Sequence, residues 1–371
     1  MKKYILILLS ATMFVACHKD KPPTSQIKID LPSTVHANKM SWVRITPQVT
    51  GDEEATYRWL LGGAEISTDK ELLHIFAAPG NYTLHFSVMG KEEASKTVTV
   101  TIADQTYTNG ITRVFEYLPA PGQFINTLPE ATAADTPETM RQKAENALKT
   151  NSMICLGGFG GYVVFGFDHT VVNKTGNDLV VLGNAGNNGA EPGVIMVSYD
   201  ANGNGAPDDE WFEIAGSEFG KPTTVKNYEI TYYKPISEPD NPDEPNYIRW
   251  TDNQGASGYL SKNSFHTQTY YPLWKGDSYT LKGTFMKATV YDHSGNGTLW
   301  VSPPYEWGYA DNYPNNHEKA QIDLNWAVDK DGNPVRLKGI DFIKVYTCNR
   351  AQGGWTGEIS TEISGFTDLN I

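Results

Sequence analysis

Residues 79–88 read Pro-Gly-Asn-Tyr-Thr-Leu-His-Phe-Ser-Val, a turn followed by a stretch in which apolar and polar side chains alternate. Alternation with a period of two puts every second side chain on one face of a β-strand, so this stretch predicts a strand with a buried face running from Tyr82 to Val88. Similar alternation occurs at Ile27–Leu31 and Val43–Val49. Because a strand with one apolar face needs a second layer to cover it, this part of the chain predicts a compact β unit.

Two motifs of this β unit carry a resemblance to a known family. Tyr57 and Trp59 stand two positions apart in a strand pattern, and Tyr82 follows the Pro-Gly turn. Together they resemble a PKD-type immunoglobulin-like domain, and the resemblance covers residues 27–103. It implies a spacer domain at 27–104 with Trp59 and Tyr82 in its core.

A polar segment, Asp104–Gly110, separates this unit from a longer region at residues 111–371. One helix is expected at Pro137–Lys149, with Thr136 as its N-cap. Long loops are expected at 235–245 and 252–282. Short runs bounded by glycine and proline predict strands at 162–167, 178–182, 194–199, 211–215, 228–233, 284–292, 321–326 and 340–347. The predicted fold is all-β, with a PKD-type immunoglobulin-like domain followed by a larger jelly-roll-like β-sandwich with one short helix.

Charge and cysteine content narrow the function classes. The formal net charge is −13, from 43 acidic and 30 basic residues, so a nucleic-acid backbone would be repelled and no nucleic-acid partner is expected. Cys155 and Cys348 are the two cysteines beyond residue 17. They could form a disulfide, but two cysteines so far apart in sequence do not make a disulfide framework, and we favour two buried thiols.

The N-terminus has the pattern of a signal peptide at residues 1–16. Two lysines precede an apolar run from Tyr4 to Val15, which is too short for the ~20 residues of a membrane span. The run ends at Cys17 and resembles a lipobox. That resemblance implies that Cys17 carries a lipid anchor and that 17–26 is the anchor and tether. The alternative is an ordinary secretory signal. The charged residues His18–Lys21 resemble the signals that send lipoproteins of Bacteroides-like bacteria to the outer surface, which implies an outer-membrane protein facing the exterior; a charged linker is the other interpretation.

Residues 200–209 have the oxygen spacing of a calcium loop. Calcium prefers six to eight hard oxygen ligands, and alternate side chains on a turning chain supply them. Position 12 is Trp211, so the bidentate glutamate of an EF-hand is absent. A structural Ca²⁺ is predicted, and the alternative is an Asn-Gly hairpin turn. The candidate ligands are Asp200, Asn202, Asn204, Ala206 (through its carbonyl) and Asp208.

Aromatic residues are concentrated near residue 305, where prolines and glycines interrupt any continuous strand. Some of these rings are expected at the surface, where aromatic faces stack on sugars or flat ligands. The alternative is ordinary core or loop packing. The candidate ligand-binding residues are Trp300, Tyr305, Trp307, Tyr309 and Tyr313, together with Trp274 and Trp355.

Catalytic motifs are not recognisable in the sequence. There is no G-x-S-x-G elbow, H-E-x-x-H helix or Cys-x-x-Cys pair, and Gly157–Gly161 leads into a strand, which indicates a tight turn. An acid–base pair could come from carboxylates such as Glu191, Glu213, Glu306 and Asp311, but spacing selects no two of them. We therefore expect a binding protein rather than an enzyme.

Residues 113–371 resemble the large C-terminal domain of PKD-containing cell-surface lipoproteins of gut Bacteroides. The segments that carry the resemblance are Leu156–Asp168, Asn177–Asn184, Glu191–Ser198 and Gly339–Tyr346. It implies a surface lipoprotein that serves a TonB-dependent transporter by binding a nutrient.

Three functions follow from that resemblance and from the aromatic residues. Cobalamin is the first ligand to test, because some of the related transporters take up cobalamin. The alternative is a glycan-binding surface protein of a polysaccharide-uptake system, which would use the aromatic rings. A third possibility, from a different class, is a carbohydrate-active hydrolase or lyase.

Overall fold

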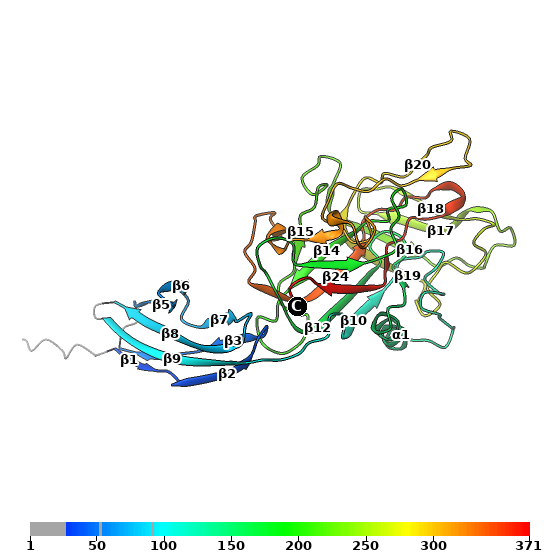
Figure 1. The fold of residues 1–371 in the computed structure, drawn as a ribbon. Coiled ribbons are helices and arrows are strands. Elements are labelled where there is room, and N and C mark those ends of the chain that lie inside the picture. Colours follow the sequence, from blue (N-terminus) through cyan, green and yellow to red (C-terminus); the bar gives the residue numbers. More distant parts are fainter. Residues whose placement is uncertain (1–26, 52–53, 91–92) are drawn as a thin grey trace, which may run out of the picture. The chain divides into compact units, whose positions relative to one another are not determined.

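The computed structural model of the chain describes residues 27–51, 54–90 and 93–371 (Figure 1). Two compact units are present. Among the described residues, one contains those from 27 to 35 together with those in Arg44–Leu72 and Asn81–Thr101, and the other contains His36–Val43, Leu73–Gly80 and Ile102–Ile371. The predicted signal peptide, Cys17 and the tether lie outside the described residues. Among the residues that are described, no helix has the length and apolarity of a membrane span.

The N-terminal strands pack around a buried tryptophan. Trp59 is fully buried, and its ring lies 4.5 Å from that of Phe86, centroid to centroid. Its indole N–H donates to the carbonyl of Asp69 at 3.2 Å. The expected core position of Trp59 is confirmed, whereas Tyr82 is only half-buried.

Five of these strands form one sheet, in which β8 and β9 are neighbours (Figure 1). In sheet order they are β2 (Thr34–Asn38), β9 (Glu93–Ala103), β8 (Gly80–Met89), β5 (Thr56–Leu61) and β6 (Ala64–Ser67). Two further pairs are β1 (Lys28–Asp30) with β4 (Gln48–Thr50) and β3 (Trp42–Ile45) with β7 (Leu72–Ile75).

A six-stranded sheet forms the centre of the larger unit. In order, its strands are β10 (Arg113–Leu118), β12 (Tyr162–Val172), β24 (Gly339–Thr347), β14 (Gly193–Ser198), β15 (Phe212–Ile214) and β23 (Ala327–Val328). A three-stranded sheet contains β22 (Gln321–Ile322), β13 (Leu179–Leu182) and β26 (Gly365–Asp368). Buried side chains of the two sheets belong to one apolar core, so the predicted β-sandwich is confirmed.

The helix α1 (Pro137–Lys149) has the predicted bounds and contributes to this core. Thr136 accepts a hydrogen bond from the N–H of Thr139, and Met140, Ala144 and Leu148 form its buried stripe. It is the one α-helix among the described residues, accompanied there by three short 3-10 turns, η1 (Glu318–Ala320), η2 (Leu324–Trp326) and η3 (Gly354–Thr356).

A four-stranded sheet lies beside the sandwich and was only partly predicted. Its strands, in order, are β18 (Ser257–Lys262), β17 (Glu244–Asp252), β16 (Val225–Tyr233) and β19 (Ser278–Phe285). The expectation of an irregular stretch at 252–282 is therefore wrong for β18 and β19. The aromatic residues of this stretch form a second core with those of the sheet, and this core includes Tyr270 and Tyr271 from the loop between β18 and β19.

Two predicted strands are shorter than expected. The stretch 284–292 is divided, because β19 ends at Phe285 and the next strand, β20 (Tyr291–Asp292), pairs with β21 (Trp300–Val301). The stretch 321–326 leaves the sheet after Ile322. There the Asp323 side chain accepts from the N–H of Asn325 and caps a 3-10 turn instead.

The glycine-rich segment Gly157–Gly161 is a tight turn, as predicted. Gly157 has φ +69°, and a Cβ at this position would lie 2.1 Å from the carbonyl oxygen of Ala120. A Cβ on Gly161 would lie 1.8 Å from the carbonyl oxygen of Leu156. Both positions require glycine because neighbouring backbone atoms fill the space that a side chain would occupy.

Cys155 and Cys348 are both buried and unbonded to each other, which confirms two buried thiols. Cys155 lies on β11 (Ile154–Cys155), which pairs with β25 (Glu362–Ile363). Burial raises the pKa of the Cys348 thiol to about 12, so it stays protonated and unreactive at neutral pH.

Candidate functional site

A groove of about 710 Å³ lies between the six-stranded and the four-stranded sheet. This volume is in the range of small-ligand sites. Trp211 and Phe219 add aromatic walls, and the turn 329–332 adds polar groups. The strand residues that line it are Met196, Glu213, Lys344 and Tyr346 on one side and Lys226, Glu229, Lys282 and Thr284 on the other.

Strand register places the polar groups of the six-stranded sheet on the groove face. Met196 is directly opposite Glu213 on β15 and Lys344 on β24, so the three side chains form a row across the sheet. The alternate residues, such as Ile195 and Val345, point into the sandwich core. One sheet therefore has an apolar face for stability and a polar face for the groove.

Tyr346, two residues beyond Lys344 on β24 and opposite Val194, connects the two sheets. Its hydroxyl accepts a hydrogen bond from the N–H of Thr284 at 2.9 Å. A Cβ on Gly283 would lie 2.4 Å from the Tyr346 ring, so glycine is required for the ring to lie flat against β19. This contact closes one wall of the groove.

Ion pairs and aromatic contacts hold the groove side chains in place. The Lys226 ammonium lies 3.2 Å from a Glu213 oxygen and 3.2 Å from the centroid of the Phe219 ring. The other Glu213 oxygen accepts from the Thr284 hydroxyl at 2.7 Å. Desolvation lowers the pKa of Lys226, partly offset by Glu213, and it also lowers the pKa of Lys344. Four lysines and four carboxylates line the groove, so its charges balance.

The groove residues were not named as ligand contacts from the sequence. Lys344 stands between Ile343 and Val345 in a predicted strand, and Glu213 stands between Phe212 and Ile214. A charged residue between two apolar core residues indicates that it lies on the opposite, polar face of its strand, and this was the signal in the sequence that could have identified both residues. That the four-stranded sheet would face these residues across a groove could be seen only in the folded structure.

Two of the predicted aromatic contacts, Tyr305 and Tyr309, are buried in the protein. The Tyr305 hydroxyl donates to the carbonyl of Lys287, and the Tyr309 hydroxyl accepts from the N–H of Glu218. Both rings pack on the groove-side face of the six-stranded sheet, where Val194 and Tyr346 join their cluster. The expectation that these two rings lie at the surface is therefore wrong. The irregular segment that carries them packs both rings against the six-stranded sheet.

The other predicted rings have separate partners. Trp307 packs on Trp326 at 4.6 Å, and Tyr313 stacks on His317 at 4.5 Å. Trp274 is half-buried against the sandwich core. None of these rings is among the residues that line the groove.

Trp300 packs against Gly354, the residue before Trp355. A Cβ on Gly354 would lie 2.4 Å from the Trp300 indole nitrogen, so the neighbouring backbone packs tightly on that ring. Trp355 is 43% exposed and lies 5.6 Å from the ring of Phe265, which is 68% exposed. Phe265 and Trp355 form an exposed aromatic pair outside the groove.

The predicted calcium loop is closed by its own hydrogen bonds. The Asp200 carboxylate accepts the N–H groups of Gly203, Asn204 and Gly205. The amides of Asn202 and Asn204 donate to the two oxygens of Asp208, which lowers the pKa of that carboxyl. The N–H of Ala206 donates to Asn204. Calcium binding at this loop stays a prediction.

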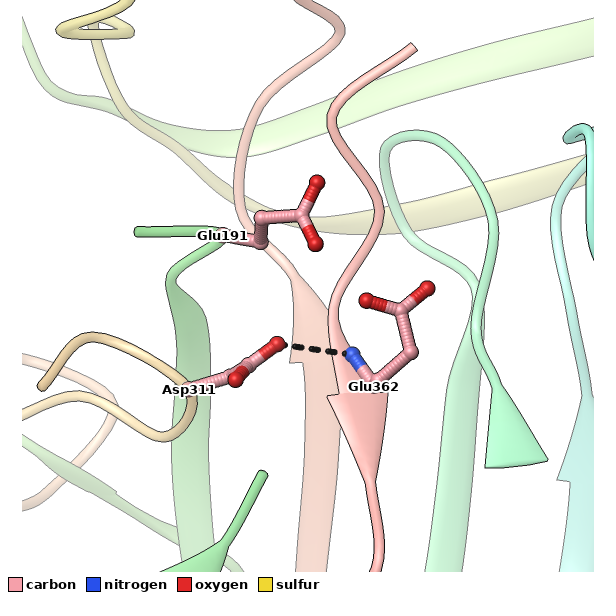
Figure 2. A group of neighbouring side chains, drawn as sticks. All are labelled: Glu191, Asp311 and Glu362. Carbon is pink, nitrogen blue, oxygen red and sulfur yellow. Dashed lines mark hydrogen bonds between the residues drawn. The ribbon is translucent and has the colours of Figure 1, made fainter. Parts of the chain in front are cut away.

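Two of the carboxylates considered for chemistry are brought together, and a third joins them (Figure 2). Glu191, Asp311 and Glu362 each place an oxygen within 4.8 Å of the other two. Burial, and then the charge of Glu362, raise the pKa of Asp311 to about 8 and that of Glu191 well above its usual range. Glu362 was not predicted, and no spacing in the sequence connects it to the others. Glu213 belongs to the groove, and Glu306 is exposed.

A family described as PKD-like domain matches residues 22–90. The N-terminal domain of this all-β chain is therefore PKD-like. No curated protein sequence matches the chain.

Three solved structures show weak likeness to the chain. One is a quinonprotein alcohol dehydrogenase-like protein from Bacteroides thetaiotaomicron, with 20% identity, 24% of this chain and 21% of that chain covered, and a TM-score of 0.18. The second is a protein from the mixed-linkage glucan utilization locus of Bacteroides ovatus, in complex with a mixed-linkage heptasaccharide. It is 12% identical, the match covers 64% of this chain and 46% of that chain, and the TM-score is 0.20. The chain spans less than half the length of these two structures.

The third likeness is to carbohydrate-binding modules of the β-sandwich superfamily, with 10% identity, 94% of this chain and 100% of that chain covered, and a TM-score of 0.18. TM-scores this low carry no argument about the function of this chain.

Proposed function

We propose that this protein is a non-enzymatic binding protein whose groove holds an uncharged oligosaccharide. The observation that carries the proposal is the composition of the groove, which combines balanced charges with aromatic walls. This takes up the glycan alternative from the sequence in place of cobalamin, which no contact in the groove favours.

Hydroxyl groups of a sugar both donate and accept hydrogen bonds, so they match a surface that offers both. Lys226, Lys282 and Lys344 supply donors, and Glu229 and Asp331 supply acceptors. Because the lysines are matched in number by carboxylates, the groove has no net attraction for a polyanion. Trp211 provides the flat apolar face on which a sugar ring stacks.

The groove carboxylates favour binding of the oligosaccharide without hydrolysis. A retaining or inverting glycosidase needs one carboxyl that can donate a proton and a second that is free to act as a base or nucleophile. Of the four groove carboxylates, Glu213 is engaged by Lys226 and Thr284, and Asp329 accepts hydrogen bonds from Asn333 in its own turn, so two of the four are already committed. We therefore expect no release of reducing sugar on incubation with the ligand.

We expect Trp211→Ala to weaken oligosaccharide binding by about 10- to 100-fold. The substitution removes roughly 1.5–3 kcal/mol of apolar contact and stacking, and 1.4 kcal/mol corresponds to a factor of ten in Kd. Isothermal titration calorimetry with a panel of neutral gluco-, manno- and xylo-oligosaccharides measures the change. Heparin fragments and cobalamin serve as charged and corrinoid comparisons.

The matched control is Trp355→Ala, which removes an indole from the exposed pair rather than from the groove. Binding should change less than about twofold, as for a surface residue outside the site. Loss of binding in Trp355→Ala with retention in Trp211→Ala would place the ligand on the aromatic pair. Binding of cobalamin alone would refute the carbohydrate proposal altogether.

The location of this activity is a further part of the proposal. A diacylglyceryl-type anchor on Cys17 would hold the groove at the outer surface, where it hands the oligosaccharide to a TonB-dependent transporter. Mass spectrometry of the N-terminal peptide should find residue 17 first and acylated, and Cys17→Ser should move the protein into the aqueous phase of a detergent partition. An unmodified Cys17 in the mature protein contradicts the anchor.

A further inference from the structure

We infer that Glu191, Asp311 and Glu362 form a binding site for a hard divalent cation, with calcium the ion that the spacing suits. One oxygen from each residue lies within 4.8 Å of the other two. Ca–O distances are about 2.3–2.6 Å, so two ligands on opposite sides of a calcium ion lie about 4.6–5.2 Å apart. The existing side-chain positions can therefore surround one ion.

The three carboxylates come from segments that are far apart in sequence (Figure 2). Glu191 lies two residues before β14, Asp311 lies in the loop before η1, and Glu362 begins β25. An ion bound here would tie these segments together, so its effect should appear in the stability of the unit. None of the three residues lines the groove, and the inference does not depend on the proposed function.

An oxygen of Glu362 lacks a hydrogen-bond partner. Glu362 is 3% exposed, its Oε1 accepts from the Ser360 hydroxyl at 2.8 Å, and its buried Oε2 receives no hydrogen bond from a donor among the described residues. The neighbouring Glu191 carboxyl can donate to Glu362 only when it is protonated. Buried polar atoms are nearly always satisfied by protein, water or an ion. Figure 2 shows the Glu362 carboxylate turned toward that of Glu191. The unsatisfied oxygen thus points to a missing ligand in the cluster.

The protein supplies no positive charge to the cluster. Within residues 27–51, 54–90 and 93–371, no lysine, arginine or histidine forms an ion pair with any of the three carboxylates. The buried Glu358 carboxylate acts electrostatically on Glu191 and Glu362 and adds to the negative charge. Buried carboxylates of this kind must either take up protons or bind a cation.

Asp311 favours the cation over full protonation. Its Oδ1 accepts the N–H groups of Asn184 and Ala185, and its Oδ2 accepts the N–H of Glu362 at 2.9 Å. Three amide donors stabilise an ionised carboxylate and fix its orientation, as outer hydrogen bonds do for metal ligands. Glu191 is partly exposed and provides the route of entry. A donor set of oxygens alone suits calcium, magnesium or manganese rather than zinc or copper.

The test is the effect of calcium on thermal unfolding of the chelator-treated protein. At a calcium concentration about 100-fold above its Kd, the melting temperature should rise by roughly 5–10 °C. Glu191→Gln and Glu362→Gln keep the side-chain shape and remove one anionic ligand each, and both should abolish most of this shift. Magnesium and manganese titrations identify the preferred ion.

The matched control is Asp200→Asn, which disables the separate loop at 200–208 and should retain the shift. Equilibrium dialysis gives a second readout, in which Asp200→Asn still binds one calcium ion and Glu191→Gln binds one ion fewer than the unsubstituted protein. The inference fails if Asp200→Asn binds no divalent ion. It also fails if the glutamine variants are more stable without metal and no cation shifts melting, because the cluster would then hold protons.

Discussion

Gly157→Ala should destabilise the larger unit by about 3–5 kcal/mol, which places it among the most damaging single substitutions in the chain. The added Cβ would lie 2.1 Å from the carbonyl oxygen and 2.9 Å from the carbonyl carbon of Ala120. Both obstacles are backbone atoms, so no side chain can rotate out of the way. The backbone φ of +69° adds strain for any residue with a Cβ. Urea unfolding followed by intrinsic fluorescence measures the loss.

The matched control is Gly176→Ala. Gly176 also has positive φ, at +95°, but nothing lies within 4 Å of the Cβ that alanine would add. Only the conformational cost of about 1–2 kcal/mol should remain. Equal losses in the two variants would mean that the clash with Ala120 is relieved by a small shift of the turn, and the close packing of this segment would have to be abandoned.

The turn at Gly157 was predictable from sequence because its cause is local. A run of glycines before an alternating strand indicates a tight turn whatever surrounds it. The same holds for α1, where Thr136, Pro137 and the apolar spacing all lie within one segment. These elements were placed correctly because each is decided by residues that are neighbours in the chain.

The four-stranded sheet was missed where local signals point elsewhere. Prolines and acidic residues precede β17, and the tyrosines before β19 have no regular period. These rings become core residues only because a second sheet covers them, as Tyr270 shows by being fully buried. Tyr305 and Tyr309 were misplaced for the same reason, since their burial depends on the distant strands β14 and β24.

The cluster of Glu191, Asp311 and Glu362 shows that a functional site, like the four-stranded sheet, cannot be assembled from local sequence signals. Glu191 and Asp311 were noticed as carboxylates, but 120 positions separate them and nothing in the sequence sets their distance. Glu362 enters through the pairing of β25 with β11, where it faces Cys155. The composition of a site can be suspected from sequence, but its assembly is a property of the fold.

His169 provides the second large effect, because it is buried between two carboxylates. Its Nδ1 lies 2.9 Å from Asp168 and its Nε2 lies 3.0 Å from Asp368, whose side chain is fully buried. A neutral imidazole has one N–H and can satisfy one of these acids, whereas the imidazolium satisfies both. Burial lowers the pKa of His169, but the hydrogen bonds to Asp368 and Asp168 outweigh it and raise the pKa above its usual value.

His169→Gln should therefore lose about 3 kcal/mol of stability near pH 6, because it breaks a buried ion pair and leaves Asp368 without a cation. A raised pKa in the folded state means that the stabilisation is fully present below the unfolded value of about 6.5 and is lost as pH rises through the folded value. The difference in unfolding free energy between the two proteins should accordingly shrink over the range above about pH 6.5. Urea unfolding at intervals over this range measures it.

His85→Gln is the control, since His85 is an exposed residue of β8. It should change stability by less than about 0.5 kcal/mol at every pH, as expected for a surface position. Comparison of the two variants separates the buried pair from the general effect of pH on an acidic protein. A His169→Gln difference that stays constant, or grows as the solution becomes more alkaline, would mean that the imidazole is neutral when folded and that one of the two carboxylates carries the proton instead.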